Sequence, residues 1–182
     1  TPEIPFRMTP QCFRNTKYGF VECKTLANHD PFWSTATLGR TLARIDYNQD
    51  GKQDLIANHL DAPAALLENQ TEGGRWLRLE LVGVTSERDA VGATITAQSK
   101  DRQWTQWVVG GHGYLCSNEA TIDIGVGELQ TIETLEVNWP AGTVQTFRNV
   151  ETNQTYLVIE SSQQLYVERI EESPREGRKA SR

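Results

Sequence analysis

The sequence predicts an all-β protein, and three observations indicate this class. Short runs that alternate apolar and polar side chains dominate the chain, and Gly, Asn, Asp and Pro residues bound them. Apolar residues at helical spacing are scarce. In the second half, the turn signals recur at the regular spacing of a β-sandwich or barrel. With 182 residues the chain is long enough to bury one core or two small ones.

Two series of strands are expected, separated by a polar, glycine-bearing run at 69–74. We place the first domain at residues 1–71, the second at 72–160 and a partly disordered C-terminal extension at 161–182. The extension begins with either a short helix or a last strand. The expected strands lie near 10–14, 19–24, 40–46, 53–59 and 64–69, and then near 75–83, 91–98, 103–109, 120–124, 131–138, 143–149 and 155–160.

Three cysteines occur, and no two of them have the spacing of a zinc-finger pair. A hairpin that turns around Lys17-Tyr18 would place Cys12 directly opposite Cys23. Cross-strand Cβ atoms come close enough there for a disulfide. Free thiols that serve as small buried apolar groups are the alternative for this pair. Cys116 is left without a partner.

The loop at 46–54, which reads Asp-Tyr-Asn-Gln-Asp-Gly-Lys-Gln-Asp, is the sharpest chemical feature of the chain. Oxygen side chains stand at its positions 1, 3, 5 and 9, and the glycine at position 6 can adopt the positive φ of a tight turn. Ca²⁺ prefers six to eight oxygen ligands from such a loop. The predicted ligands are Asp46, Asn48, Asp50, the backbone carbonyl of Lys52, whose side chain plays no part, and Asp54.

The flanks of this loop distinguish it from an EF-hand. Position 12 is Ala57 instead of the required glutamate, and the apolar segments 41–45 and 55–57 read as strands instead of helices. A solvated hairpin turn is the alternative, because Asp, Asn and Gly are also common turn residues.

Composition and charge exclude several classes of function. The net charge of −6 argues against nucleic-acid binding, which needs a basic surface. Transmembrane helices need an apolar run of about 18 residues, and the sequence has none. The basic residues at 175–182 read as a solvated tail. The chain begins Thr1-Pro2-Glu3 without a visible signal peptide, and we expect a processed or excised piece.

Several motifs of the second domain resemble the ASPIC/UnbV domain, which occurs in cartilage-acidic-protein-like proteins and many secreted bacterial proteins. Their order and their spacing both agree with that family. The segments that carry the resemblance are Trp76–Gly83, Ser86–Ala93, Gly110–Leu115, Ile124–Gly127 and Val137–Gly142.

The first domain resembles the FG-GAP (VCBS) repeat that precedes this domain in the family. Met8–Asn15, Gly39-Arg40 and Pro63–Asn69 match the repeat, although Lys52-Gln53 interrupts the usual loop pattern. The resemblance implies propeller-blade-like hairpins around a structural Ca²⁺ ion. It also implies a secreted or periplasmic, non-enzymatic interaction or adhesion module, with an unidentified protein or glycan partner and no membrane insertion.

Carbohydrate binding is the rival function, because five tryptophans in an acidic β protein offer stacking surfaces. Trp104 and Trp107 should point to opposite sides of their strand. Trp76 and Trp139 are expected in the core, and Trp33 is expected to be the freest for contact.

Two further sites were weighed and disfavoured. A hydrolase could combine His112 with Asp123 or Glu119, but neither a nucleophile elbow nor a paired-histidine metal motif accompanies them. A second metal site could combine His29 and His59 with nearby aspartates, although such neighbours are common surface pairs. We therefore expect no catalytic residues.

Overall fold

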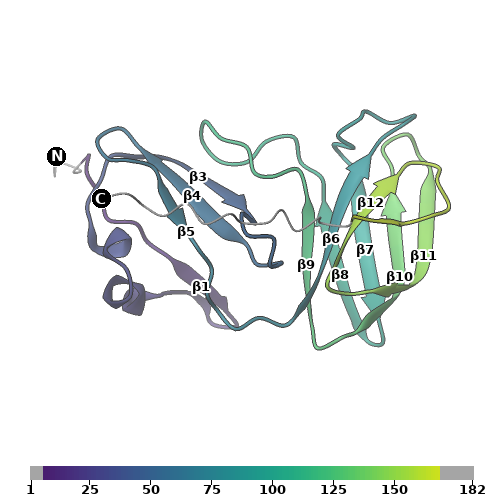
Figure 1. Cartoon of the computed structure of the whole chain (residues 1–182), viewed down its shortest axis with the longest axis horizontal. Coiled ribbons are helices and arrows are strands. Elements are labelled where there is room, and N and C mark those ends of the chain that lie inside the picture. Colours follow the sequence, from purple (N-terminus) through teal and green to yellow (C-terminus); the bar gives the residue numbers. More distant parts are fainter. Residues whose placement is uncertain (1–5, 169–182) are drawn as a thin grey trace, which may run out of the picture. The chain divides into compact units, whose positions relative to one another are not determined.

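Thirteen β-strands and two short 3-10 helices make up residues 6–168, the part of the chain that the computed structural model describes (Figure 1). The all-β prediction is confirmed. The chain forms two compact units: Thr1–Gly73 with Val109–Glu119, and Gly74–Val108 with Ala120–Arg182. The expected disorder of the extension beyond residue 168 lies outside the described residues.

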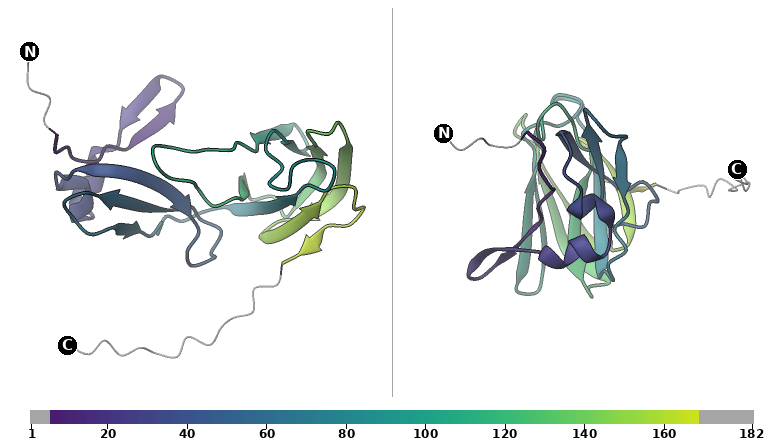
Figure 2. Two further views of the ribbon diagram at one scale, coloured as in Figure 1. Left: turned by 90° about the horizontal axis from the view of Figure 1, so that it is seen from above. Right: turned by 90° about the vertical axis from the view of Figure 1, so that its left-hand side faces the viewer.

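The first unit holds a hairpin, two 3-10 helices and a three-stranded antiparallel sheet. Its hairpin turns at Lys17-Tyr18 as predicted, and Gly19 takes a φ of 106° there. In Figure 2 the hairpin (purple) stands apart from the three-stranded sheet of the same unit. The elements are β1 (Phe13–Thr16), β2 (Gly19–Glu22), η1 (Lys24–Asn28), η2 (Pro31–Ser34), β3 (Gly39–Ile45), β4 (Asp54–His59) and β5 (Ala65–Leu67).

The two 3-10 helices were not predicted. At four and five residues they are too short to show a helical spacing of apolar side chains. The start of η2 does carry a signal, because Pro31 occupies its first turn and the Asp30 carboxylate accepts the Phe32 N–H at 2.7 Å.

The second unit consists of two four-stranded sheets. One has the order β11-β10-β7-β8, and the other has the order β13-β12-β6-β9, in which β6 and β12 run parallel. The strands are β6 (Arg75–Val82), β7 (Thr94–Ser99), β8 (Arg102–Trp107), β9 (Ile122–Gly127), β10 (Thr131–Asn138), β11 (Val144–Glu151), β12 (Gln154–Ile159) and β13 (Tyr166–Val167).

Both sheets contribute to one apolar core. Leu77 and Val158 come from one sheet, Ile95 and Leu135 come from the other, and all four are fully buried. The sheets therefore pack face to face as a sandwich, and they do not close into the barrel that the sequence left open.

One strand prediction needed correction. The strand expected at 120–124 is β9, which continues through Gly125 to Gly127. Its register with β6 shifts at a bulge between Arg75 and Trp76. Glycine within a strand often accompanies a bulge, and the pairing with β6 keeps this strand extended. For the segment after residue 161, where a short helix and a last strand were both open, the structure has the short strand β13.

Candidate functional site

The 46–54 loop joins β3 to β4, so the strand flanks predicted for it are confirmed. Ile45 pairs with Asp54 at the base of the loop, which closes the hairpin. Gly51 has a φ of 83°, as its position in the loop predicts, and Gln49 has a φ of 59°. These two left-handed residues curl the backbone so that its N–H groups point into the loop.

Asp46 and Asp54 are the two buried carboxylates of the loop. Asp46 is 3% exposed, and its oxygens accept the N–H groups of Asp50 at 3.0 Å and Gly51 at 2.8 Å. Asp54 is 1% exposed and accepts the N–H groups of Tyr47 at 3.2 Å and Asn69 at 2.7 Å. Burying a charge is costly unless it is hydrogen-bonded, and these bonds offset part of that cost.

Asp50 forms a more exposed group with its neighbours. It accepts the Asn48 side-chain amide at 3.2 Å and the Lys52 N–H at 2.9 Å, and the Lys52 ammonium lies 3.2 Å from its Oδ2. Partial burial works against ionisation of Asp50, but the hydrogen bonds and the charge from Lys52 outweigh it and lower the pKa. The Lys52 side chain, which was expected to add a positive charge beside the loop without acting as a ligand, thus pairs with one of the predicted ligands.

The five predicted positions thus gather in one loop, with their carboxylates directed mainly at backbone N–H groups. Among residues 6–168, no group of three or more His, Cys, Asp or Glu side chains has the arrangement of a metal site. The loop is therefore organised by its own hydrogen bonds in this structure.

Glu119 is a member of this site that the sequence analysis did not find. Its carboxylate accepts the Asp46 N–H at 3.3 Å, and its own N–H donates to the Arg44 carbonyl at 3.3 Å. Next to it, the Asn118 side chain accepts the Arg44 N–H at 2.9 Å. The C-terminal end of the segment Val109–Glu119 is therefore hydrogen-bonded along the end of β3, within the first unit. No local pattern could predict this, because Glu119 and Asp46 are 73 positions apart.

The hydrolase candidates have structural roles. The backbone carbonyl of His112, not its imidazole, accepts the Cys116 thiol at 3.4 Å, and the Glu119 carboxylate accepts the Asp46 N–H of the 46–54 loop. Asp123 accepts the Arg78 Nε–H at 2.6 Å and the Thr121 hydroxyl at 3.2 Å in the second unit.

The aspartates of the second candidate metal site also have other partners. Asp30 caps η2, and Asp61 accepts the Leu38 N–H at 2.8 Å and an ion pair from Arg7 at 2.6 Å. His59 Nδ1 lies 3.0 Å from the Pro63 carbonyl. These bonds fix the loops around β3 and β4.

The tryptophan predictions hold on β8 and for Trp139, but not for Trp76 and Trp33. Trp104 packs against the core and Trp107 is 60% exposed, so the two rings lie on opposite faces. Trp139 is buried, as expected, but Trp76, which was also expected in the core, is only half-buried and lies outside the core cluster. Trp33, the expected contact residue, is half-buried and packs edge-on against Phe32, so Trp107 is the freer ring.

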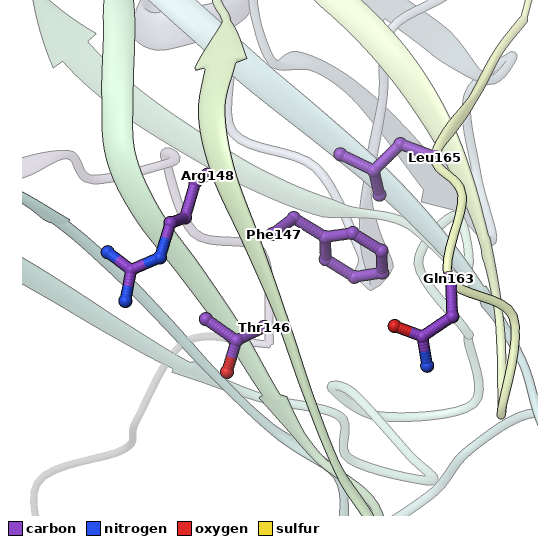
Figure 3. A pocket seen from close by; sticks show the side chains of 5 residues that line it. All are labelled: Thr146, Phe147, Arg148, Gln163 and Leu165. Atoms are coloured by element: carbon purple, nitrogen blue, oxygen red, sulfur yellow. The ribbon is translucent and has the colours of Figure 1, made fainter.

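A shallow pocket of about 540 Å³ lies beside β11 (Figure 3). It is lined by Thr146, Phe147, Arg148, Gln163 and Leu165. Phe147 and Leu165 form an apolar floor that belongs to the core, and Arg148 supplies a positive charge. The lining side chains include no carboxylate, imidazole or thiol, the groups that most often act as general bases or nucleophiles in enzymes.

Glu160, in the second unit, is a third buried carboxylate, and no sequence motif pointed to it. At 2% exposure, its Oε2 accepts the N–H groups of Val84, Thr85 and Ser86 at 2.7–2.8 Å. Its Oε1 accepts the hydroxyls of Ser86 at 2.9 Å and Thr143 at 3.1 Å. Burial opposes ionisation of Glu160, yet these hydrogen bonds prevail and lower its pKa to about 2.

The Glu160 cluster gives a physical reason for two of the segments that carry the ASPIC/UnbV resemblance, Ser86–Ala93 and Val137–Gly142. Ser86 begins one of them, and its hydroxyl also accepts the N–H of Ala141, which belongs to another. Both motifs thus converge on one carboxylate, and their role is to hold loops of the sandwich in place.

Comparison with known proteins shows that the part of the chain that contains these motifs resembles a known family. Residues 83–165 match the family described as ASPIC and UnbV. Over 120 residues the chain is 31% identical to Cartilage acidic protein 1 of Homo sapiens, and this stretch covers 63% of the chain but 18% of that protein. The ASPIC/UnbV resemblance is confirmed for this region, and the calcium-repeat resemblance of the first domain stays a prediction. None of the helices among the described residues is both long and apolar enough to span a bilayer.

Proposed function

We propose that this chain is a non-enzymatic, extracellular interaction or adhesion module whose first unit is stabilised by Ca²⁺. The observation that carries the proposal is the pair of buried carboxylates, Asp46 and Asp54, that closes the loop between β3 and β4. Two like charges at the base of one loop repel each other, and a divalent cation relieves that repulsion.

The donor set fits a hard cation. Asp46, Asn48, Asp50, Asp54 and the Lys52 carbonyl would supply oxygen ligands. A carboxylate has about four acceptor positions, so the two N–H groups that Asp46 and Asp54 each accept do not by themselves prevent these oxygens from contacting an ion. The Lys52 ammonium is the competitor, and it would have to leave Asp50 when the ion binds.

An interaction role is supported by the exposed side of the first unit. Phe20 is directly opposite Asn15 in the β1–β2 hairpin, so these two side chains point to the same face. Phe13 is two positions before Asn15 on β1, and it therefore lies on that face too. Both rings are at least half exposed. Apolar surface of this kind favours a protein partner. Similarity to a protein named for cartilage supports an extracellular setting.

Glycan binding is the second candidate, and the exposed ring of Trp107 on the edge strand β8 favours it. Tryptophan fluorescence on an oligosaccharide panel tests it. A change that disappears in Trp107→Ala would support glycan binding, and a silent panel would exclude it as the function of this face.

Calcium titration of Asp50→Ala against the parent chain tests the ion site. Asp50 is suitable because its side chain is about one-third exposed, so the variant should fold. Asp89→Ala, which removes an exposed aspartate of the second unit, is the matched control. Ca²⁺ should raise the melting temperature of the parent and of the control but not that of Asp50→Ala, and EDTA should reverse the rise. Equal shifts for all three proteins, or no shift in the parent, would remove the calcium site.

A further inference from the structure

Cys12 and Cys23 face each other across the open end of the first hairpin. The β1–β2 register ends with Phe13 opposite Glu22, and the next pair along is Cys12 with Cys23. The Cys23 N–H donates to the Cys12 carbonyl at 2.8 Å, so the pairing continues to this point. Directly opposed residues in an antiparallel pair point to the same face, with Cα atoms about 5.5 Å apart at hydrogen-bonded positions. That separation is among the commonest for disulfides.

The two thiols also interact directly. Burial, and then the neighbouring Cys23 with a hydrogen bond between the two thiols, raises the pKa of Cys12. Both residues are half-buried, so a small oxidant can reach them. Cys116 is engaged elsewhere, because its thiol donates to the carbonyls of Leu42 at 3.3 Å and His112 at 3.4 Å. The structure holds all three cysteines as free thiols.

We propose that Cys12 and Cys23 are a redox-active pair that forms an intrachain disulfide by exchange with a small disulfide such as oxidised glutathione. One cysteine thiolate attacks a sulfur of glutathione disulfide, which forms a mixed disulfide and releases one glutathione thiolate. The second cysteine then loses its proton to solvent, attacks the protein sulfur of the mixed disulfide and releases the second glutathione. Two electrons pass from the cysteine pair to the oxidant, and two molecules of reduced glutathione result.

The bond would brace the least supported element of the first unit. β1 and β2 form a two-stranded sheet by themselves, and an isolated hairpin of this size is marginally stable in water. The turn at Lys17-Tyr18 fixes one end of the hairpin, and the disulfide would fix the other. It would also hold the face that carries Phe13 and Phe20. This inference is independent of calcium binding.

Thiol counting in glutathione buffers tests the proposal on the unmodified chain. The fully reduced protein should show three reactive thiols when denatured, and after equilibration with excess oxidised glutathione it should show one. The intact mass should fall by about 2 Da, the two hydrogens lost on oxidation. Peptide mapping should find the Cys12–Cys23 link. Three thiols that persist, or a link that includes Cys116, would overturn the proposal.

Trypsin and one variant provide independent readouts. Cleavage after Lys17, in the turn between the strands, should leave the two fragments joined in the oxidised protein and separable after reduction. Cys116→Ser should form the same link and retain no thiol. Fragments that separate without reductant, or a Cys116→Ser protein that forms no link, would contradict the pairing.

Discussion

The Glu160 cluster makes a sharp prediction about acid stability. Replacing Glu160 with Gln keeps the size of the side chain but removes its charge and one of its acceptor oxygens. Five hydrogen bonds converge on this carboxylate: three from consecutive backbone N–H groups of the 84–86 loop, and two from the hydroxyls of Ser86 and Thr143. An amide can satisfy only some of these donors, and those left over stay buried.

The size and sign of the effect follow from the pKa. Glu160 has an ordinary pKa of 4.5, and the folded protein lowers it to about 2. The folded state therefore binds the proton far more weakly than the unfolded chain, by roughly two orders of magnitude or more. A lowered carboxyl pKa stabilises the fold fully above pH 4.5, and this contribution disappears as the pH falls toward 2.

Thermal unfolding of the parent and of Glu160→Gln, measured from pH 2 to pH 7, tests this reasoning. At neutral pH the variant should melt lower by on the order of 5–10 °C. The difference between the two melting temperatures should shrink steadily below pH 4.5, because the carboxyl of the unfolded parent chain takes up a proton there while the folded protein resists protonation until about pH 2. A difference that stays constant over the whole pH range, or no difference at pH 7, would refute the account of Glu160 as an ionised anchor.

Two other substitutions probe the first and second units. Lys52→Met removes the ammonium that lies 3.2 Å from Asp50, and we expect calorimetry to show Ca²⁺ binding tightened by about two- to fivefold, since partly exposed ion pairs contribute little. Unchanged or weaker binding would show that Lys52 does not compete with the ion. Gly83→Ala should lower the free energy of unfolding in urea by on the order of 1–3 kcal/mol, because the added Cβ would overlap the carbonyl oxygen of Glu87. Gly73→Ala is the control, with no atom within 4 Å of its Cβ, and an equal loss in both variants would contradict the steric argument.

Local features of the first unit could be predicted well. The turn at Lys17-Tyr18 and the loop at 46–54 depend on neighbouring residues, so turn chemistry and alternation were enough to place the strands around them. Alternation also predicted that Trp104 and Trp107 lie on opposite faces of β8, as their burial confirms. The exceptions were the two short helices, of which η2 is fixed by a proline and a cap instead of a repeating pattern.

The candidate site could be predicted only in part, because neighbouring residues determine only some of its contacts. The residues of the 46–54 loop are consecutive, and their grouping was visible in the sequence. The role of Glu119 beside Asp46 was not, and neither was the ion pair of the Lys52 side chain, because both depend on how the folded backbone directs the groups. Trp33 was expected to be the freest ring for contact, but the backbone of η2 sets it edge-on against its neighbour Phe32, an arrangement that the sequence did not indicate.

By itself, the sequence determined that the chain is built of strands, where most of them turn, and which loop gathers oxygen side chains. Periods of two residues and turn-forming side chains act between near neighbours and need no distant partner. The tertiary structure decided that the second unit is an open sandwich, that β6 runs parallel to β12, and that Glu160 anchors the 84–86 loop. The β6–β12 pairing and the Glu160 contacts join residues more than 70 positions apart. The sequence allows many such pairings, and burial of one core shared by both sheets selects among them.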